Sequence, residues 1–165
     1  NSLDLDDFDT SNVENMEGLF AGNSSRFNTA YRAKISLNTS NVKNMSKLFH
    51  YTYVSYLDLS DLDVRKVTNF SKAFDYTWLY ELDLTNWNTI SATDMSNMFG
   101  GSTWLTKIYA SDSFTTANVT SYNGIFRSLS SYRGQAGSAI PNDNSIDYAH
   151  IDGGTANPGA FWRKP

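Results

Sequence analysis

The sequence predicts an α/β repeat protein, a right-handed solenoid of about five units with roughly 25 residues in each. One observation is a closing phenylalanine that returns at Phe20, Phe49, Phe74, Phe99 and Phe126, with spacings of 29, 25, 25 and 27 residues. A second is that other apolar columns keep the same spacing, as do Met16, Met45, Phe70, Met95 and Tyr122. The third is composition, because 18% charged and 15% aromatic residues favour neutral polar groups that pair in ladders between repeats.

A strand is predicted at the start of each unit. Its apolar residues are Val54, Leu57 and Leu59, then Leu79, Leu82 and Leu84, then Leu105, Ile108 and Ala110. This L-x-x-L-x-L spacing is typical of leucine-rich repeats, in which alternate residues point into a continuous core. The second unit lacks the pattern around residues 33–37 and has an insertion at 23–32, where we expect a bulge or a looped-out excursion.

A short helix is predicted after each strand. The apolar residues of its first copy are Val13, Met16, Leu19 and Phe20. Their spacing of i, i+3, i+6 and i+7 places them on one helical face, and Ser11 or Asn12 can cap the helix before them. Since one unit cannot bury its apolar face alone, the units must stack. The predicted fold class is a leucine-rich-repeat-type solenoid, with a parallel sheet and short helices.

Two regions are predicted along the chain. Residues 1–126 form the solenoid, and residues 127–165 form a C-terminal cap, a linker, or both. All three prolines and half of the ten glycines lie in the second region, yet its apolar residues allow it to fold over the last repeat. The chain opens at Asn1 on a full repeat, so we expect it to be a piece of a longer protein.

Composition excludes several classes of partner and site. The net charge of −4 and the pI near 5.0 argue against nucleic acid as a partner, and no apolar run is long enough for membrane insertion. The chain has no cysteine and only two histidines, His50 and His150, without an evident partner. No motif of a catalytic nucleophile, zinc site or phosphate loop occurs. We therefore expect no enzyme activity, no metal and no cofactor.

Polar residues also recur in columns at the repeat period. One column is Asn15, Asn44, Asn69 and Asp94, and another is Asp9, Asn38, Asp63 and Asn88. Calcium needs six to eight converging oxygens, and no loop has a calcium-binding spacing. We interpret these columns as hydrogen-bond ladders.

The outward-facing strand residues are the candidate binding site. They are Tyr56, Asp58, Tyr80, Glu81, Asp83, Lys107 and Tyr109, and Asp4 would extend the column of aspartates. Tyrosine offers a large contact area at low entropic cost, so this face suits protein or glycan binding. The alternative is a solvated face whose aspartates maintain solubility.

A second aromatic set precedes the strands. Tyr53, Trp78 and Trp104 recur near the repeat period and could stack along one edge. They could form a platform for sugar rings, or they could only stabilise neighbouring turns, which is the interpretation we favour.

The repeated phrases resemble one family of bacterial surface proteins. They are Leu82-Asp83-Leu84-Thr85-Asn86-Trp87-Asn88-Thr89 and Ser40-Asn41-Val42-Lys43-Asn44-Met45-Ser46-Lys47-Leu48-Phe49. Over residues 3–126 the chain resembles the BspA-like leucine-rich-repeat proteins. The resemblance implies an extracellular location on a bacterial surface, typical of Gram-positive species, and a role in adhesion.

The functional hypothesis is an adhesin module that binds a host or neighbouring-cell surface protein, mucin or glycan through the strand face. Two alternatives stay open, a passive structural spacer and a lectin-like module that uses Trp78 and Trp104. The oligomeric state is left open.

Overall fold

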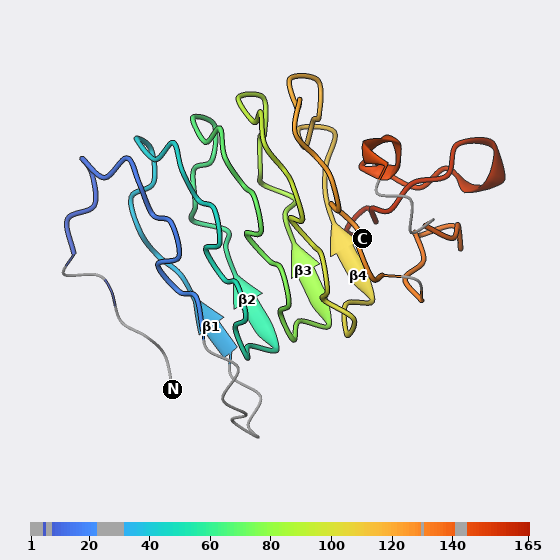
Figure 1. Cartoon of the computed structure of the whole chain (residues 1–165), viewed down its shortest axis with the longest axis horizontal. Helices are drawn as coiled ribbons and strands as arrows, with labels where there is room; N and C mark the ends of the chain where they lie inside the picture. Colours follow the sequence, from blue (N-terminus) through green and yellow to red (C-terminus); the bar gives the residue numbers. More distant parts are fainter. Residues whose placement is uncertain (1–4, 6–7, 23–31, 130, 141–144) are drawn as a thin grey trace.

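The computed structural model describes residue 5 and residues 8–22, 32–129, 131–140 and 145–165. In this part of the chain, successive turns lie side by side, and four strands follow one another along the stack (Figure 1). The strands are β1 (Arg32–Lys34), β2 (Tyr56–Asp58), β3 (Glu81–Asp83) and β4 (Lys107–Tyr109). Two 3-10 helices, η1 (Ile146–Tyr148) and η2 (Gly154–Ala156), lie in the C-terminal segment.

The prediction of an α/β leucine-rich-repeat solenoid is wrong. The strands pair as two separate parallel sheets, β1 with β2 and β3 with β4, rather than as one sheet across all units. The described residues contain no α-helix, and most of them lie in turns and loops. Turns therefore replace every predicted helix that falls in the described part of the chain.

Alternating hydrogen bonds prevent helix formation in these segments. In residues 45–52 every second N–H donates to a carbonyl of the neighbouring turn, as Lys47 does to Ser71 over 2.8 Å. Of the N–H groups in between, that of Ser46 donates to the side chain of Asn44, and the others donate three residues back, as Leu48 does to Met45 over 3.3 Å. An α-helix would instead direct each N–H to the carbonyl four residues back. The segments are thus chains of tight turns joined sideways to their neighbours.

Left-handed residues separate the turns. Positive φ angles recur at the repeat period in Gly18, Lys47, Lys72, Asn97 and Gly124. A second left-handed residue follows four positions later in most copies, for example Tyr51 with φ of 55° and Tyr76 with φ of 56°. A right-handed helix cannot include such residues.

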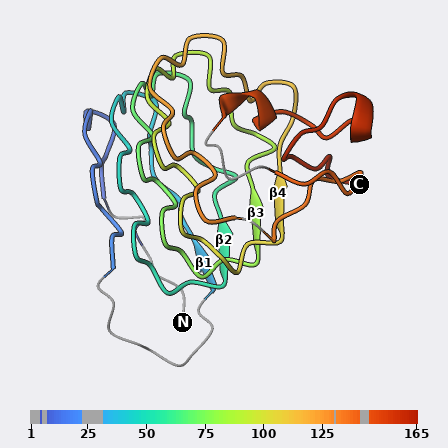
Figure 2. The same ribbon diagram turned by 45° about the vertical axis from the view of Figure 1, so that its right-hand side comes forward.

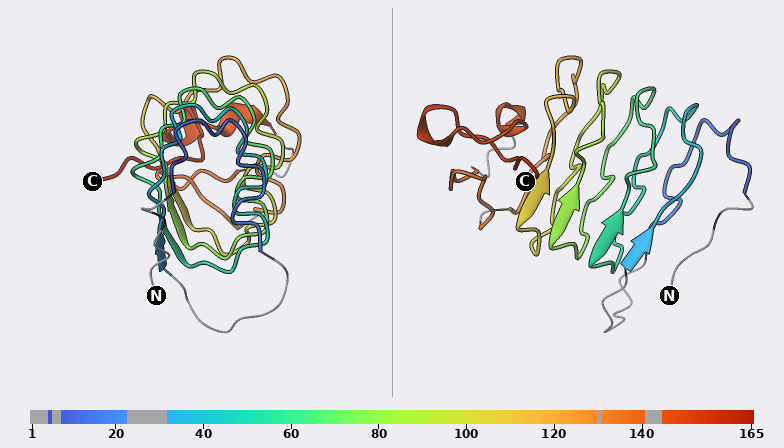
Figure 3. Two further views of the ribbon diagram at one scale, coloured as in Figure 1. Left: turned by 90° about the vertical axis from the view of Figure 1, so that its left-hand side faces the viewer. Right: turned by 180° about the vertical axis from the view of Figure 1, so that it is seen from behind.

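One of the two polar columns forms the predicted ladder between turns, whereas the side chains of the column of Asp9, Asn38, Asp63 and Asn88 bond locally, to the N–H two positions later. Parallel bridges join Asn15 to Asn44, Asn44 to Asn69, Asn69 to Asp94, and Asp94 to Ser121. In the first four of these residues the side-chain oxygen accepts the N–H two positions later, as Asn69 does from Ser71 at 2.8 Å. Viewed along the stack, successive turns nearly superpose around a common centre (Figure 3).

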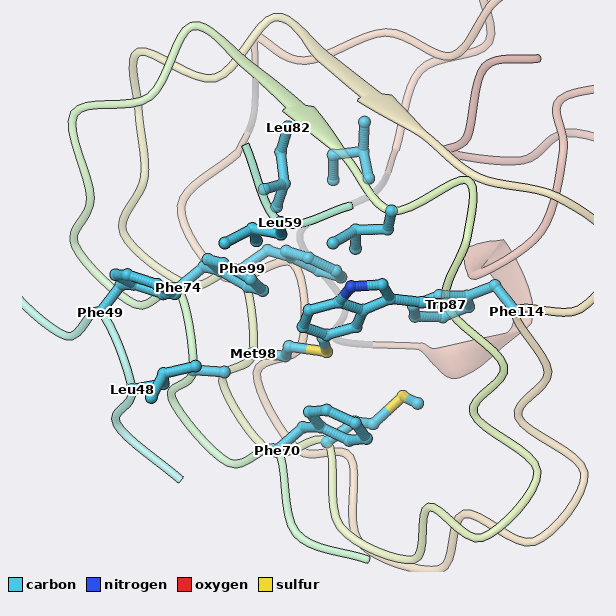
Figure 4. Packing of buried hydrophobic residues seen from close by; sticks show 14 of the residues in the cluster. Leu48, Phe49, Leu59, Phe70, Phe74, Leu82, Trp87, Met98, Phe99 and Phe114 are labelled. Carbon is cyan, nitrogen blue, oxygen red and sulfur yellow. The ribbon is translucent and has the colours of Figure 1, made fainter. Parts of the chain in front are cut away.

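The predicted apolar columns form the core. All nine apolar strand residues named above are buried. The phenylalanines stack with centroid separations of 5.3, 5.7, 6.1 and 5.7 Å between successive rings, and Figure 4 shows Phe49, Phe74 and Phe99 in a row beside Trp87. The exceptions lie in the first and last copies: Leu19 is 50% exposed, because no described turn covers that end of the stack, and Tyr122 is 39% exposed.

The C-terminal segment packs against the last turn. Trp162 donates its N–H to the carbonyl of Ile108 over 2.9 Å and accepts the N–H of Ala110 over 3.0 Å, so it lies along β4. The ring of Phe161 packs edge-on against Phe114, with 4.9 Å between centroids. Figure 2 shows this segment in dark red at the β4 end of the stack.

Two expectations fall outside the described residues. They concern Asp4 and the excursion at 23–32, of which only the backbone of Arg32 is described, in β1. None of the helices in the described ranges is long and apolar enough to cross a membrane.

Candidate functional site

The outward side chains of β2, β3 and β4 form one face, here called the strand face. Backbone alternation points Leu57, Leu82 and Ile108 into the core and their neighbours outward. The structure places Tyr56 and Asp58 on β2, Glu81 and Asp83 on β3, Lys107 and Tyr109 on β4, and Tyr80 just before β3. The parallel register sets Glu81 opposite Lys107 and Asp83 opposite Tyr109.

The positive charge of Lys107, the one lysine of the predicted binding set, is paired with a carboxylate of the strand face. Lys107 Nζ lies 2.8 Å from Glu81 Oε1, and this hydrogen bond raises the pKa of Lys107. The ammonium also lies 5.4 Å from the ring centroid of Trp162 and 6.0 Å from that of Tyr109. Such an exposed pair contributes little stability, but it orients the side chains. Tyr56 and Tyr80 remain 44% and 52% exposed.

A groove of about 330 Å³ opens on the strand face where β2 meets β3. The two sheets are separate there. Ile35 donates its N–H to Asp58 and Leu84 donates to Tyr109, but within the described residues no equivalent backbone bond joins Leu59 to Asp83. The lining residues of this seam groove are Tyr56, Leu57, Asp58, Leu59, Ser60, Asp83, Thr85, Asn86, Trp87 and Lys164.

Two carboxylates stand on either side of the seam groove. Asp58 Oδ1 accepts the hydroxyl of Ser60 at 2.7 Å and its N–H at 3.1 Å, and these bonds lower the pKa of Asp58. Burial raises the pKa of Asp83, but the ammonium of Lys164, 2.5 Å from Oδ2, and Thr85 outweigh it and leave that pKa lowered. Both groups are ionised at neutral pH.

Two polar atoms of the groove residues have no partner. Thr85 Oγ1 and Trp87 Nε1 are buried and make no hydrogen bond within the described structure. Trp87 is only 1% exposed, and its ring lies among core side chains such as Met98 in Figure 4. Buried polar groups are nearly always paired in native proteins, so these two atoms require an explanation.

The aromatic set before the strands forms a stack. Ring centroids of Tyr53 and Trp78 are 4.7 Å apart, and those of Trp78 and Trp104 are 5.7 Å apart. Tyr80 lies edge-on to Trp104 at 6.0 Å. Tyr53 and Trp104 pack against Trp78 from its two neighbouring turns, so the middle ring of the set has no open face for sugar stacking. This geometry favours a role in joining neighbouring turns over a sugar platform.

A separate polar cluster surrounds Asp75, which is 2% exposed. Its carboxylate lies 3.2 Å from a guanidinium nitrogen of Arg127 and 3.4 Å from His50 Nδ1, so His50 has a partner that sequence reasoning missed. Arg127 also donates to Asn97 and to the hydroxyl of Tyr76. Burial raises the pKa of Asp75 to about 6, although Arg127 and Lys72 act to lower it. Every partner here holds the turns together, which indicates a structural role.

The candidate set from the sequence leaves out five polar or aromatic groove residues, Ser60, Thr85, Asn86, Trp87 and Lys164. The repeated Asp-x-Ser and Asp-x-Thr spacings could have indicated the first two, because an aspartate commonly accepts the N–H two residues later. Nothing in the local sequence connects Lys164 with Asp83, which lies 81 positions earlier. Within the described residues no group of three or more side chains is suited to a metal ion.

Comparison with known proteins gives a family without an assigned function. No curated protein and no solved structure matches the chain. One family model matches twice, over residues 1–109 and 54–140, and is described as "Mycoplasma protein of unknown function, DUF285". The two matches overlap by more than one repeat and together span most of the chain, in agreement with its internal repetition. The chain belongs to the DUF285 family.

Proposed function

We propose that this chain is a non-catalytic binding module of a bacterial cell surface. It recognises a protein, mucin or glycan of a host or neighbouring cell through the strand face. The observation that supports this proposal is the exposure of Tyr56 and Tyr80, 44% and 52%, on adjacent turns of a hydrogen-bonded stack. Exposed aromatic residues on a firm backbone are typical of binding surfaces, because few side-chain rotamers are lost on contact. The resemblance of the repeats to BspA-like proteins supports the extracellular location.

Binding of the purified chain to an array of matrix proteins, mucins and glycans tests the proposal. We expect a saturable, salt-tolerant interaction that the double variant Tyr80→Ala, Tyr109→Ala abolishes without unfolding. Tyr122→Ala is a matched control, since Tyr122 is also exposed but follows Ser121 in the polar ladder rather than a strand. Its affinity should equal that of the unaltered chain.

A blank array would contradict the binding module. The stacked rings and polar ladders would then favour the alternative of a passive spacer, whose only task is to hold its shape. Binding that survives the double tyrosine variant would instead remove the strand face from the proposal.

A further inference from the structure

We propose that Tyr51 and Tyr76 form an oxidative cross-linking site, at which a peroxidase and hydrogen peroxide join the two rings as dityrosine. The cross-link connects two neighbouring turns of the same chain by a covalent bond. This inference concerns residues outside the strand face and does not depend on the proposed binding function.

The backbone of the turns brings the two rings together. Tyr51 and Tyr76 have equivalent positions in neighbouring turns, and both are left-handed, with φ of 55° and 56°. The N–H of Tyr51 donates to the carbonyl of Asp75 over 3.0 Å, which fixes the register of the two turns at this point. Two side chains on equivalent backbones in register point the same way. Their rings are therefore parallel, with 4.7 Å between the centroids and 3° between the planes.

The ring of Tyr76 is held in place by the turns that follow it. Gly101 has the equivalent position in the next turn, and a Cβ atom there would lie 2.7 Å from the Tyr76 ring, so glycine leaves the room that the ring needs. The guanidinium of Arg127 lies 5.2 Å from the ring centroid of Tyr76 and donates to its hydroxyl over 3.2 Å. These contacts keep the phenol of Tyr76 facing that of Tyr51.

The pair is accessible and has no equal in the described structure. Tyr51 and Tyr76 are 38% and 37% exposed, so an oxidant reaches both. Among the ring contacts of the described residues, this one alone joins two tyrosines, whereas Tyr53 and Tyr80 contact tryptophans. A radical formed on either ring of the pair therefore has its coupling partner in the same molecule.

Hydrogen peroxide balances the reaction. The peroxidase reduces it to two water molecules and removes one electron and one proton from each phenol. The two tyrosyl radicals couple through the carbon atoms next to their oxygens, which forms one carbon–carbon bond. The hydrogen atoms on these carbons then move to the oxygens and restore both phenols. The product has lost two hydrogen atoms and gained no other group.

Peroxidase treatment of the folded chain at low protein concentration tests the site. We expect dityrosine fluorescence in a product that is still a monomer and whose intact mass is lower by two hydrogen atoms. Trypsin should release residues 48–65 joined to residues 73–107, and fragmentation should place the bond between Tyr51 and Tyr76. Absence of this linked pair overturns the inference, as does dityrosine that forms only between two molecules.

Tyr51→Phe is the decisive variant. Phenylalanine keeps a ring against Tyr76 but has no phenol O–H to oxidise, so the fold should be retained and the dityrosine of the monomer should be lost. Tyr122→Phe is the matched control, because Tyr122 is exposed and no other ring contacts it within the described residues. Its dityrosine yield should equal that of the unaltered chain. Equal yields from the two variants overturn the inference.

The cross-link should also stabilise the stack. A bond between residues of two repeats restricts the unfolded chain, and the rings are already in contact in the native state. The urea midpoint of the treated protein should therefore rise above that of the untreated protein, and treatment of Tyr51→Phe should not raise it. A midpoint that falls on cross-linking overturns the inference, because it shows that the bond distorts the native turns.

Discussion

At the scale of single residues, the fold uses polar side chains mainly as connectors between turns. Asp75 is a clear example, because Arg127, His50 and the positive charge of Lys72 surround one carboxylate from three different turns. Removing a carboxylate from water disfavours its ionised form, and nearby cations only partly compensate. This balance gives Asp75 a pKa of about 6, and stability must therefore depend on pH.

We expect the free energy of unfolding to fall as pH rises from about 4 to about 6. The native state holds the Asp75 proton more tightly than the unfolded chain, whose aspartate pKa is about 3.9, so ionisation costs up to about 3 kcal/mol of stability across this window. Urea unfolding at pH 4, 5, 6 and 7 measures the effect. Asp75→Asn should abolish the fall, whereas Asp58→Asn, which removes a carboxylate of lowered pKa, should retain it.

His50 supplies the check on this interpretation. Burial lowers the pKa of His50, so the unfolded chain binds that proton more tightly, and His50 makes stability increase as pH rises toward 6.5. In the Asp75→Asn variant, the free energy of unfolding should therefore rise with pH toward 6.5. A fall between pH 4 and pH 6 that persists in Asp75→Asn would contradict the role of Asp75.

At the scale of elements, the sequence predicted which residues are buried but not the backbone that buries them. Val42, Met45, Leu48 and Phe49 are all buried, as their spacing indicates. This spacing is expected both for a helix and for a chain of tight turns whose N–H groups donate to the neighbouring repeat. Hydrophobic periodicity therefore does not distinguish a helix from such turns. The missed signal was Gly18, Asn97 and Gly124 in one column, since glycine and asparagine favour the left-handed conformation.

Lys72→Gly tests the turn directly. Lys72 has a φ of 58°, a conformation costly for lysine and free for glycine, so the variant should gain about 0.5–1 kcal/mol of stability. Ser71→Gly is the matched control at a neighbouring residue without positive φ, and it should lose about 0.5–1 kcal/mol. Chemical denaturation measures both. Destabilisation by both glycines would agree with a helix and would contradict the turn.

The candidate site shows the same division between what sequence can and cannot predict. Alternation placed Tyr56, Asp58, Glu81 and Asp83 on the outer face of neighbouring turns. The seam between β2 and β3 could not be predicted, because the two strands have nearly identical local sequences and the gap depends on how whole turns pair. Contacts across 81 residues, such as that of Lys164 with Asp83, likewise follow only from the folded chain.

At the scale of the whole molecule, the two described ends of the stack differ. At one end Phe8 and Leu19 are 67% and 50% exposed, although their equivalents in later turns, Trp87 and Met98, are buried. At the other end Phe161 covers the rings of Phe99 and Phe126, with 6.3 Å between centroids in both pairs. Since each turn is buried by its neighbours, the side chains that close the stack have a large effect on its stability.

Phe161→Ala should therefore destabilise the protein far more than the same change at the opposite end. Phe161 is 1% exposed, and truncation of a buried phenylalanine costs about 3–5 kcal/mol through lost transfer energy and the cavity left behind. Phe8→Ala is the matched control, and as an exposed change it should stay within about 0.5 kcal/mol of the unaltered protein. Urea unfolding gives the two energies, and amide exchange locates the loss. If Phe161 closes the stack, protection should fall first in residues 107–126, which it covers, and last in the turns around Phe49. Equal energies for the two variants would show that the C-terminal segment does not stabilise the last turn.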